Sequence, residues 1–476
     1  MVPFAKTGGL ADVAGALPLA LKGLIKDVRI ILPLYQEVKK KKLPLITLAQ
    51  DIRVNVKGEI AVGSAYQTDL DDGIRVYLIE NDKYYDRDKL YGTPKGDYPD
   101  NAERFTFFCK TVLNLCRKIN FQPDVIHCHD WQTALIPAFL KTIYKNDQFF
   151  AKTGTVFTIH NIGYQGLFEK EAMEITGLPW ETFVMDGVEF YGKVNLLKAG
   201  IVYSEVINTV SKKYSEEIQT PEYGFGLDGI LRYRQQDLFG VLNGVDYSEW
   251  NPEKDRFIAE RYGLKNLTGK KQCKFDLLKE FKIPIEFRKY PFMGVISRLA
   301  DQKGFDLLAE VINDLMKLDL VFILLGTGDQ QYQDLFSLIA QKFPDKTGIK
   351  IGFDNVLAHK IEAGCDMFLM PSRYEPCGLN QMYSLKYGTI PIVRATGGLD
   401  DTIENFNAKT GKGNGFKFHS YSSQELLNKV NEALAVYSDQ KAWQKLTQNA
   451  MSADFSWKVS AREYVSLYEK ALNKKQ

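Results

Sequence analysis

The chain has 476 residues, and its 61 basic and 59 acidic side chains leave a formal charge of +2, which argues against a protein that binds nucleic acid. Hydrophobic residues make up 45% and charged residues 25%, an ordinary globular composition, and the length predicts two domains. The 6 cysteines form no Cys-x-x-Cys pair, and the sequence contains neither a membrane-spanning apolar run nor a signal peptide. We therefore expect a cytoplasmic protein with no membrane and no nucleic acid among its partners.

Short apolar segments rich in β-branched residues alternate with helical patterns along the first half of the chain. These segments are VRIILPLY from Val28, RVYLIEN from Arg75, DVIHCHD from Asp124, TVFTIHN from Thr155 and VINTVS from Val206. The alternation predicts βαβ units arranged around a parallel sheet.

A second series of such segments follows after a gap. It comprises PFMGVISRL from Pro291, LVFILLGTGD from Leu320, IKIGF from Ile349, MFLMPSR from Met367 and IPIVRATGG from Ile390. The stretch NGVDYSEWNPEKD between the two series is polar and aperiodic, as linkers are. The pattern predicts two Rossmann-like domains, residues 1–245 and 246–456, followed by a helix, residues 457–476, whose domain partner the sequence leaves open.

The chain opens on MVPFAKTGGLADVAGALPLAL, a glycine turn and an amphipathic helix with no strand before them. In an open α/β sheet such a turn follows a strand, which delivers the N–H groups of the next helix to a ligand. Lys6 and Gly9 could hold an anion at this helix start, or the turn could be only a tight connection. The spacing alone leaves both interpretations open.

Two turns of the second series carry charged residues directly after a strand. SRLADQKG places Arg298 and Lys303 where two cations could clamp a diphosphate, although, taken alone, an ordinary solvated loop explains the stretch better. PSRYEPCGLNQ places Glu375 in a loop and Gly378 at a helix start, so the carboxylate could hold sugar hydroxyls while the backbone amides hold phosphate. Glu375 could instead be a helix-start residue favoured by the helix dipole.

The histidines of the first series gather at strand ends. In HCHDW, His127 and His129 point to the same side of a strand, but no third ligand at a recognisable spacing accompanies them, so we predict no metal site. Asp130, at the carboxyl end of this strand, is the better functional candidate. His160 and Asn161 end the next strand in TIHNIGYQG, at the edge where α/β sheets bind ligands.

The stretches KTGGLADV, HCHDW, TIHNIGYQG, NGVD, SRLADQKG, SRYEPCGL and TGGLDDT together resemble, in this order, the bacterial glycogen synthases and plant starch synthases over nearly the whole chain. That family consists of retaining glucosyltransferases with the α/β GT-B fold, in which two Rossmann-like domains face each other across a deep cleft. The resemblance implies transfer of glucose from ADP-glucose to the non-reducing 4-hydroxyl of glycogen or another α-1,4-glucan, with retention, no metal and no cofactor.

The resemblance also implies roles for particular residues. Arg298 and Lys303 are expected to neutralise the diphosphate, Glu375 to contact the donor sugar, His160 to stabilise positive character at the anomeric carbon, and Asp130 to shape the acceptor side. Further residues are implied in substrate binding: Lys6, Gly9, Asn161, Asn243, Phe353, Cys377, Gly378, Leu379, Thr396, Gly397 and Gly398. Among these, Phe353 is expected against the nucleotide base and Asn243 at the hinge.

The chain also departs from the family pattern. Tyr383 stands where many transferases of this fold carry a second glutamate, which favours the synthase branch, and Asn380 replaces an expected threonine. Relatives carry an apolar strand before PFAKTGGL, so we expect that Met1 is not the natural start and that a chain without this strand folds poorly. The alternative is an inactive or weakened glucan-binding or nucleotide-binding homologue. A glucan phosphorylase would need a lysine-bound pyridoxal phosphate, and no stretch resembles that site.

Overall fold

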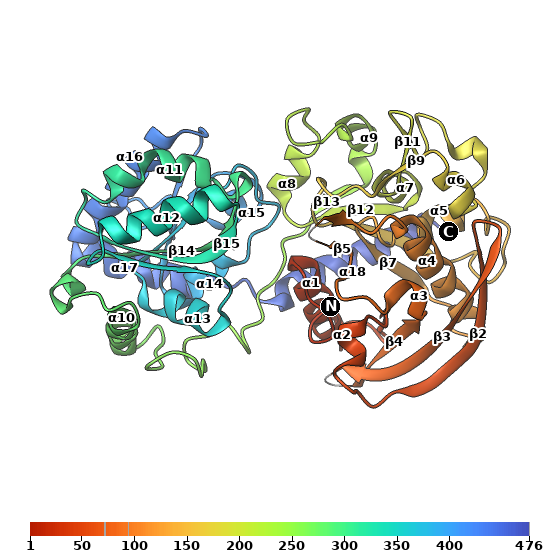
Figure 1. Ribbon diagram of the computed structural model, residues 1–476, viewed down its shortest axis with the longest axis horizontal. Coiled ribbons are helices and arrows are strands. Elements are labelled where there is room, and N and C mark those ends of the chain that lie inside the picture. Colours follow the sequence, from red (N-terminus) through yellow and green to blue (C-terminus); the bar gives the residue numbers. More distant parts are fainter. Residues whose placement is uncertain (71–72, 94, 476) are drawn as a thin grey trace. The chain divides into compact units, whose positions relative to one another are not determined.

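The computed structural model describes residues 1–70, 73–93 and 95–475. They form two compact units, each built from β-sheets with helices packed against them (Figure 1). The N-terminal unit comprises Met1–Val210, Ser215–Gly244 and Trp457–Gln476, and the C-terminal unit comprises Ser211–Tyr214 and Val245–Ser456. Among the described residues, no helix is long and apolar enough to cross a membrane.

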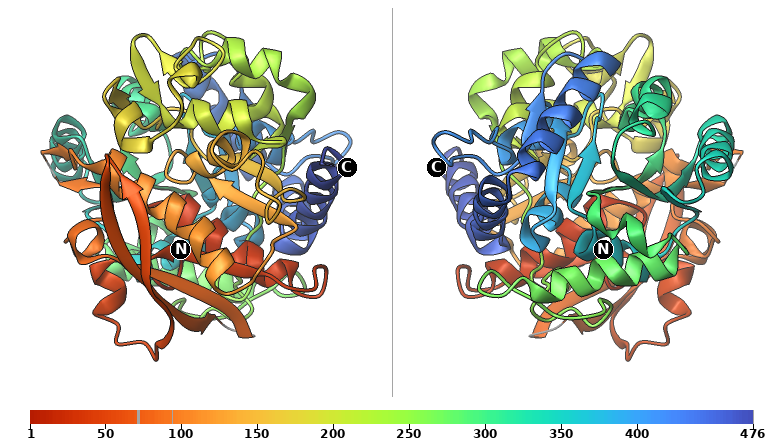
Figure 2. Two further views of the ribbon diagram at one scale, coloured as in Figure 1. Left: turned by 90° about the vertical axis from the view of Figure 1, so that its right-hand side faces the viewer. Right: turned by 90° about the vertical axis from the view of Figure 1, so that its left-hand side faces the viewer.

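The first sheet of the N-terminal unit has the strand order β1-β4-β3-β2. Its strands are β1 (Arg29–Pro33), β2 (Ile46–Val56), β3 (Glu59–Leu70) and β4 (Ile74–Glu80). Only β1 and β4 are parallel. The long curved hairpin of β2 and β3, red to orange in Figure 2, was not predicted from the sequence. Its turn residues Lys57 and Gly58 both have positive φ, of 56° and 79°, which is the pattern of a type I′ hairpin turn.

The second sheet of this unit is fully parallel, with the order β13-β12-β8-β7. Its strands are β7 (Val125–His129), β8 (Gly154–Ile159), β12 (Val206–Thr209) and β13 (Leu238–Gly240). The sequence predicted one parallel sheet here, and that prediction was wrong, because the unit has two four-stranded sheets and one of them is mostly antiparallel. Within the described residues, β1 pairs only with β4 and β7 only with β8.

Helices cover both sheets, and the last of them settles the question of the C-terminal segment. Helix α18 (Trp457–Asn473) packs against α1 (Gly9–Leu21) and β8, so it belongs to the N-terminal unit. The other helices of the first 244 residues are α2 (Gln36–Lys39), α3 (Asp82–Tyr85), α4 (Asn101–Lys118), α5 (Leu135–Lys141), α6 (Ala172–Thr176), α7 (Leu196–Tyr203), α8 (Lys212–Glu217) and α9 (Asp228–Tyr233). Smaller strands are β5 (Gly92–Thr93), β6 (Gly96–Asp97), β9 (Leu167–Glu169), β10 (Glu189–Phe190) and β11 (Lys193–Asn195).

The C-terminal unit has one six-stranded parallel sheet with the order β16-β15-β14-β17-β18-β19. Its strands are β14 (Phe292–Leu299), β15 (Val321–Gly328), β16 (Thr347–Ile351), β17 (Met367–Met370), β18 (Ile390–Arg394) and β19 (Phe416–Phe418). Its helices are α10 (Thr268–Glu280), α11 (Phe305–Leu315), α12 (Gln330–Lys342), α13 (Asn355–Gly364), α14 (Asn380–Tyr387), α15 (Gly397–Thr402), α16 (Ser423–Ser438) and α17 (Gln440–Ser452).

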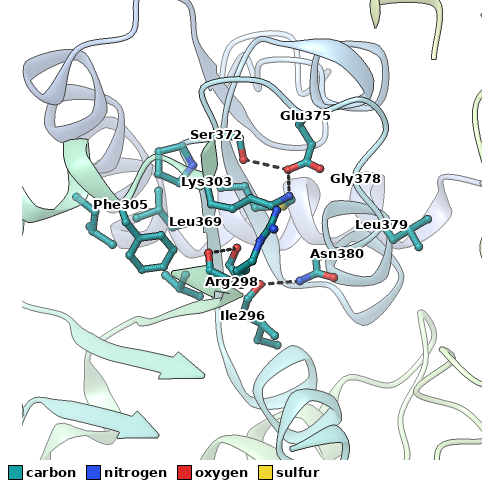
Figure 3. Close-up of a pocket in the computed structure, with 15 residues that line it drawn as sticks. Ile296, Arg298, Lys303, Phe305, Leu369, Ser372, Glu375, Gly378, Leu379 and Asn380 are labelled. Carbon is teal, nitrogen blue, oxygen red and sulfur yellow. Dashed lines mark hydrogen bonds and ion pairs between the residues drawn. The ribbon is translucent and has the colours of Figure 1, made fainter. Parts of the chain in front are cut away.

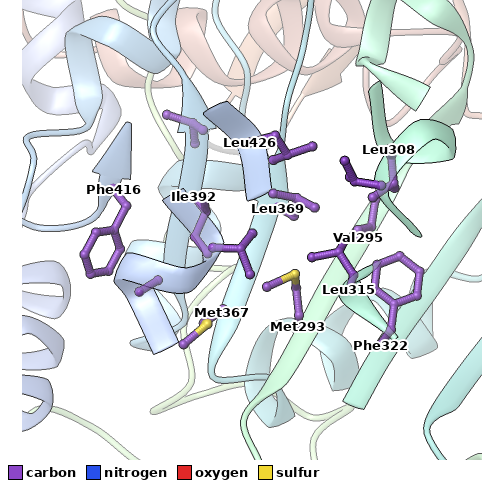
Figure 4. Packing of buried hydrophobic residues seen from close by; sticks show 14 of the residues in the cluster. Met293, Val295, Leu308, Leu315, Phe322, Met367, Leu369, Ile392, Phe416 and Leu426 are labelled. Carbon is purple, nitrogen blue, oxygen red and sulfur yellow. The ribbon is translucent and has the colours of Figure 1, made fainter. Parts of the chain in front are cut away.

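The core of this unit explains why its strands read as nearly continuous apolar runs. Alternate residues of β14 and β17 point to opposite faces, and both faces are covered by helices, so both sets of side chains are buried. Figure 4 shows Val295 and Met293 of β14 packed near Leu315 of α11 on one of these faces. The order of the strands reverses between β14 and β17, and in open α/β sheets ligands bind at the carboxyl ends of the strands at such a point.

Candidate active site

A pocket of about 220 Å³ opens at this reversal point of the C-terminal unit (Figure 3). It is lined by the carboxyl end of β14, the short helix η5 (Asp301–Lys303), the loop after β17 and the start of α14. Arg298, Lys303, Glu375, Gly378 and Leu379 all line it, so segments far apart in the sequence meet as the sequence analysis expected.

Lys303 and Glu375 form an ion pair in this pocket. The Lys303 Nζ lies 2.6 Å from Glu375 Oε2, and the Ser372 hydroxyl donates to the same oxygen at 3.1 Å. The side chains are only 21% and 8% exposed, so the interpretation of this stretch as a solvated loop was wrong for Lys303. A buried carboxylate with a fixed cation and a hydroxyl beside it is suited to hold the polar edge of a ligand.

Arg298 and the start of α14 complete the polar lining. The Arg298 guanidinium donates to Gln302 Oε1 at 2.9 Å, which leaves further N–H groups for an anion. The Asn380 amide donates to the Ile296 carbonyl at 2.9 Å and ties the helix start to β14. The N-cap residue of α14, Leu379, makes no side-chain cap, so within the described residues backbone N–H groups at the start of this helix are available to a ligand.

The turn before α15 supports the loop that carries Glu375. A Cβ atom on Gly397, whose φ is +44°, would lie 1.9 Å from the Glu375 carbonyl oxygen, and one on Gly398 would lie 2.0 Å from the Cys377 oxygen. Cys377 and Thr396 are buried, and neither lines the described pocket. The turn of Thr396, Gly397 and Gly398 therefore packs against the loop that carries Glu375 and Cys377, and the turn itself does not line the described pocket.

Phe353 lies outside the pocket. It follows β16 on a loop, and 89% of its surface is exposed. An aromatic side chain with this exposure offers a free face for stacking.

In the N-terminal unit, Asp130 and His160 meet at the carboxyl ends of β7 and β8. The Asp130 Oδ1 accepts a hydrogen bond from the His160 backbone N–H at 2.7 Å, and the Asp130 N–H donates to the Thr158 carbonyl at 2.9 Å. Asp130 has a φ of 53°, an uncommon conformation that these contacts hold in place. Burial raises the pKa of the Asp130 carboxyl to about 7.

The three histidines of this unit contact one another or shared partners. The His129 Nδ1 lies 3.1 Å from the His160 Nε2, and the two nitrogens of His127 meet the Thr158 hydroxyl and the Tyr468 hydroxyl. Burial lowers the pKa of His129 to about 4 and the pKa values of His127 and His160 well below their usual range. All three imidazoles are therefore neutral at pH 7. Among the described residues, no group of three or more His, Cys, Asp or Glu is placed to hold a metal ion.

The remaining predicted residues of this unit lie at two further places. Lys6 forms an exposed ion pair with Asp12 at 2.6 Å beside the start of α1, and an added Cβ on Gly9 would meet no atom within 4 Å. The Asn161 Oδ1 accepts from the Gly163 N–H at 2.9 Å and so shapes its own loop. Asn243 is 6% exposed, and its Oδ1 has no hydrogen-bond partner among the described residues.

Sequence reasoning missed several residues that shape these sites. Ser372 directly follows β17, and this position was the only signal that could have pointed to it. Tyr468 lies on α18 and reaches His127 across 341 residues of sequence, a contact that no local pattern could indicate.

The comparisons with known proteins agree with one another. A family model described as starch synthase catalytic domain matches residues 1–233, and one described as glycosyl transferases group 1 matches residues 278–451. The glycogen synthase of Koribacter versatilis is 52% identical over 470 residues, covering 99% of this chain and 96% of that protein. The glycogen synthase of Moorella thermoacetica is 49% identical, covering 100% and 96%.

The solved structures show the same relationship. The catalytic domain of starch synthase IV from Arabidopsis thaliana, bound to ADP and acarbose, superimposes with a TM-score of 0.90 at 32% identity, covering 99% of this chain and 98% of that one. The sucrose-phosphate synthase of Thermosynechococcus elongatus, at 16% identity and a TM-score of 0.58, shares the fold, covering 98% of this chain and 94% of that one.

Proposed function

The chain belongs to the glycogen synthase family of retaining glucosyltransferases with the GT-B fold, and on that premise we propose that its donor is ADP-glucose and its acceptor the non-reducing 4-hydroxyl of an α-1,4-glucan. A nucleotide-sugar donor and a glucan acceptor follow from the family. The alternative of an inactive glucan-binding homologue has no support in these relationships.

The observation that carries the proposal is the ion pair of Lys303 and Glu375 beside Arg298. When the glycosyl bond breaks, negative charge grows on the departing diphosphate, and two fixed cations and the free N–H groups at the start of α14 would stabilise it. Glu375 would accept hydrogen bonds from the hydroxyls of the donor glucose, which orients the ring. The same pocket would therefore hold both the leaving group and the sugar.

Residues of the N-terminal unit would contribute to the same reaction. Because the His160 imidazole is neutral, it would tolerate positive character at the anomeric carbon better than an imidazolium would. Asp130, with a pKa of about 7, would accept a hydrogen bond from the acceptor when ionised. Lys6, Gly9, Asn161 and Asn243 would contact the substrates around them.

ADP-glucose is favoured over UDP-glucose on two grounds. The related starch synthase IV was solved with ADP, and Phe353 presents an exposed aromatic face that would stack on a purine.

Thr396, Gly397 and Gly398 would contribute to substrate binding indirectly, because they support the loop that carries Glu375.

The test is transfer of labelled glucose from ADP-glucose and, in parallel, from UDP-glucose to glycogen. We expect incorporation with ADP-glucose at a kcat/KM at least tenfold above that with UDP-glucose, and loss of incorporation in the Glu375→Gln variant. Phosphate-dependent release of glucose phosphate from glycogen, or equal use of both donors, would contradict the proposal.

A further inference from the structure

Buried hydrogen bonds and ring contacts surround His160 within the N-terminal unit. Hydrogen bonds join the Tyr464 and Tyr468 hydroxyls of α18 with Asn208, Thr158 and His127, the ring of His127 packs against that of His129, and a separate hydrogen bond joins His129 to His160. These side chains come from four elements that are far apart in the sequence. Each buried polar group needs a hydrogen-bond partner, and each can donate or accept only a fixed number of hydrogen bonds. The bond made by one group therefore restricts the bonds that its neighbours can make.

The direction of the bonds can be derived for His127. The Thr158 hydroxyl donates its only proton to the Asn208 Oδ1 at 2.5 Å, so it must accept from the His127 Nε2 at 2.6 Å. The Nε2 of His127 therefore carries the proton. In the neutral ring the Nδ1 is then an acceptor, and it accepts a hydrogen bond from the Tyr468 hydroxyl at 3.0 Å.

His129 connects this fixed ring to His160. Its ring centroid lies 4.1 Å from that of His127, and its backbone N–H and carbonyl are both bonded to the Thr133 hydroxyl, at 2.6 and 2.8 Å. Packing and these bonds leave the His129 ring little freedom. Its Nδ1 is 3.1 Å from the His160 Nε2, and since both rings are neutral, one proton lies between the two nitrogens.

From this geometry we propose that His129 is a positioning residue, which holds the His160 imidazole in one tautomer and one orientation through the bond between Nδ1 and Nε2. The proposal rests on the function proposed above, in which His160 faces the reacting carbon. The backbone of His160 is held separately by Asp130, so Asp130 places the residue while His129 orients its ring.

Two variants separate the hydrogen bond from the packing. In His129→Asn, the amide lies near the place of Nδ1 and can either donate or accept, so the bond to His160 is kept. In His129→Phe, the ring packing against His127 is kept and the bond is lost. We expect His129→Phe to lower kcat by about 10- to 100-fold with KM for ADP-glucose changed less than about threefold, and His129→Asn to retain most of the kcat.

A spectroscopic readout tests the same point without activity. The chain has 5 histidines, so selective 15N labelling of the imidazoles gives few signals, and substitution of His160 assigns its own. We expect a single tautomer for His160 in the unmodified protein and a mixture of tautomers in His129→Phe. This arm stands even if the unmodified protein transfers no glucose, an outcome that would overturn the proposed function alone.

Three results would overturn the positioning role. One is a mixture of His160 tautomers in the unmodified protein, which needs no variant to fold. The second is an unchanged His160 spectrum in a folded His129→Phe protein. The third is an equal loss of kcat in the asparagine and phenylalanine variants, which would show that keeping the hydrogen bond to His160 does not preserve activity.

Discussion

Breaking the ion pair of Lys303 and Glu375 is expected to affect stability and activity in separable ways. Lys303→Met leaves Glu375, which is 8% exposed, without its cation, and removal of one partner of a buried pair costs about 3–5 kcal/mol. Lys303 itself is 21% exposed, so water reaches the pair and the lower end of that range applies, about 3 kcal/mol.

The opposite substitution should be milder. Glu375→Gln leaves a lysine whose flexible stem can turn its charged head toward water, so we expect a loss of about 1 kcal/mol. In the double variant neither charge is stranded, and the loss should be smaller than the sum of the two single losses by about 2 kcal/mol. The exposed pair of Lys317 and Asp314, 2.7 Å apart, provides the control, because Lys317→Met should cost less than about 0.5 kcal/mol.

Denaturant unfolding of the unmodified protein, the two single variants and the double variant measures the coupling free energy between Lys303 and Glu375. Glucose transfer by the same four proteins measures the effect on the reaction. If Lys303 and Glu375 both act on the donor, turnover stays at least about 100-fold low in the double variant even though its stability recovers. A double variant that regains both stability and turnover would refute the reasoning, because the pair would then be structural only. Strictly additive losses of stability would refute the described coupling.

Further predictions concern the loop support, a buried carboxyl and the donor base. Gly397→Ala places a Cβ 1.9 Å from the Glu375 carbonyl oxygen and should lower kcat/KM about 100-fold. The control is Gly229→Ala, whose added Cβ meets nothing within 4 Å and should leave kcat/KM unchanged. Wild-type kinetics in Gly397→Ala would contradict the supporting role of this turn. The pKa of the buried Glu362 is raised by burial to about 8, above its unfolded value, so the native state loses stability as pH rises from about 4.5 to 8. Glu362→Gln should remove this loss, stabilising the protein by up to about 4 kcal/mol at pH 8 and by little near pH 4.5 in urea unfolding, and a gain independent of pH would disprove the assignment. Phe353→Ala should raise KM for ADP-glucose about fivefold with little change in kcat, since stacking contributes about 1 kcal/mol to binding and none to the chemical step; an unchanged KM would place the base elsewhere.

Much of the site could be predicted because an α/β fold ties function to local sequence. A ligand-binding turn follows a strand and precedes a helix, so Arg298, Glu375, Asp130 and His160 could be found from their position after an apolar run. The strands that carry them were found for the same reason, since a strand covered by helices on both faces is a continuous apolar segment.

The β2 and β3 hairpin was missed because its strands alternate buried and exposed residues, a weaker pattern than a continuous apolar run. Its turn, Lys57 and Gly58, is also less distinctive than an asparagine and glycine pair. The division of the N-terminal strands into two sheets was equally hidden, because strand pairing is decided between segments and not within one.

The sequence by itself determined which apolar segments become buried parallel strands, which turns follow them and which family the motifs resemble, because all of these depend on neighbours in the chain. Only the tertiary structure decided that Lys303 is paired with Glu375, that α18 belongs to the N-terminal unit and that its Tyr468 reaches His127. These contacts join residues 72 and 341 positions apart. A hydrogen bond or ion pair depends on distances of about 3 Å, and such distances arise only when whole elements have packed.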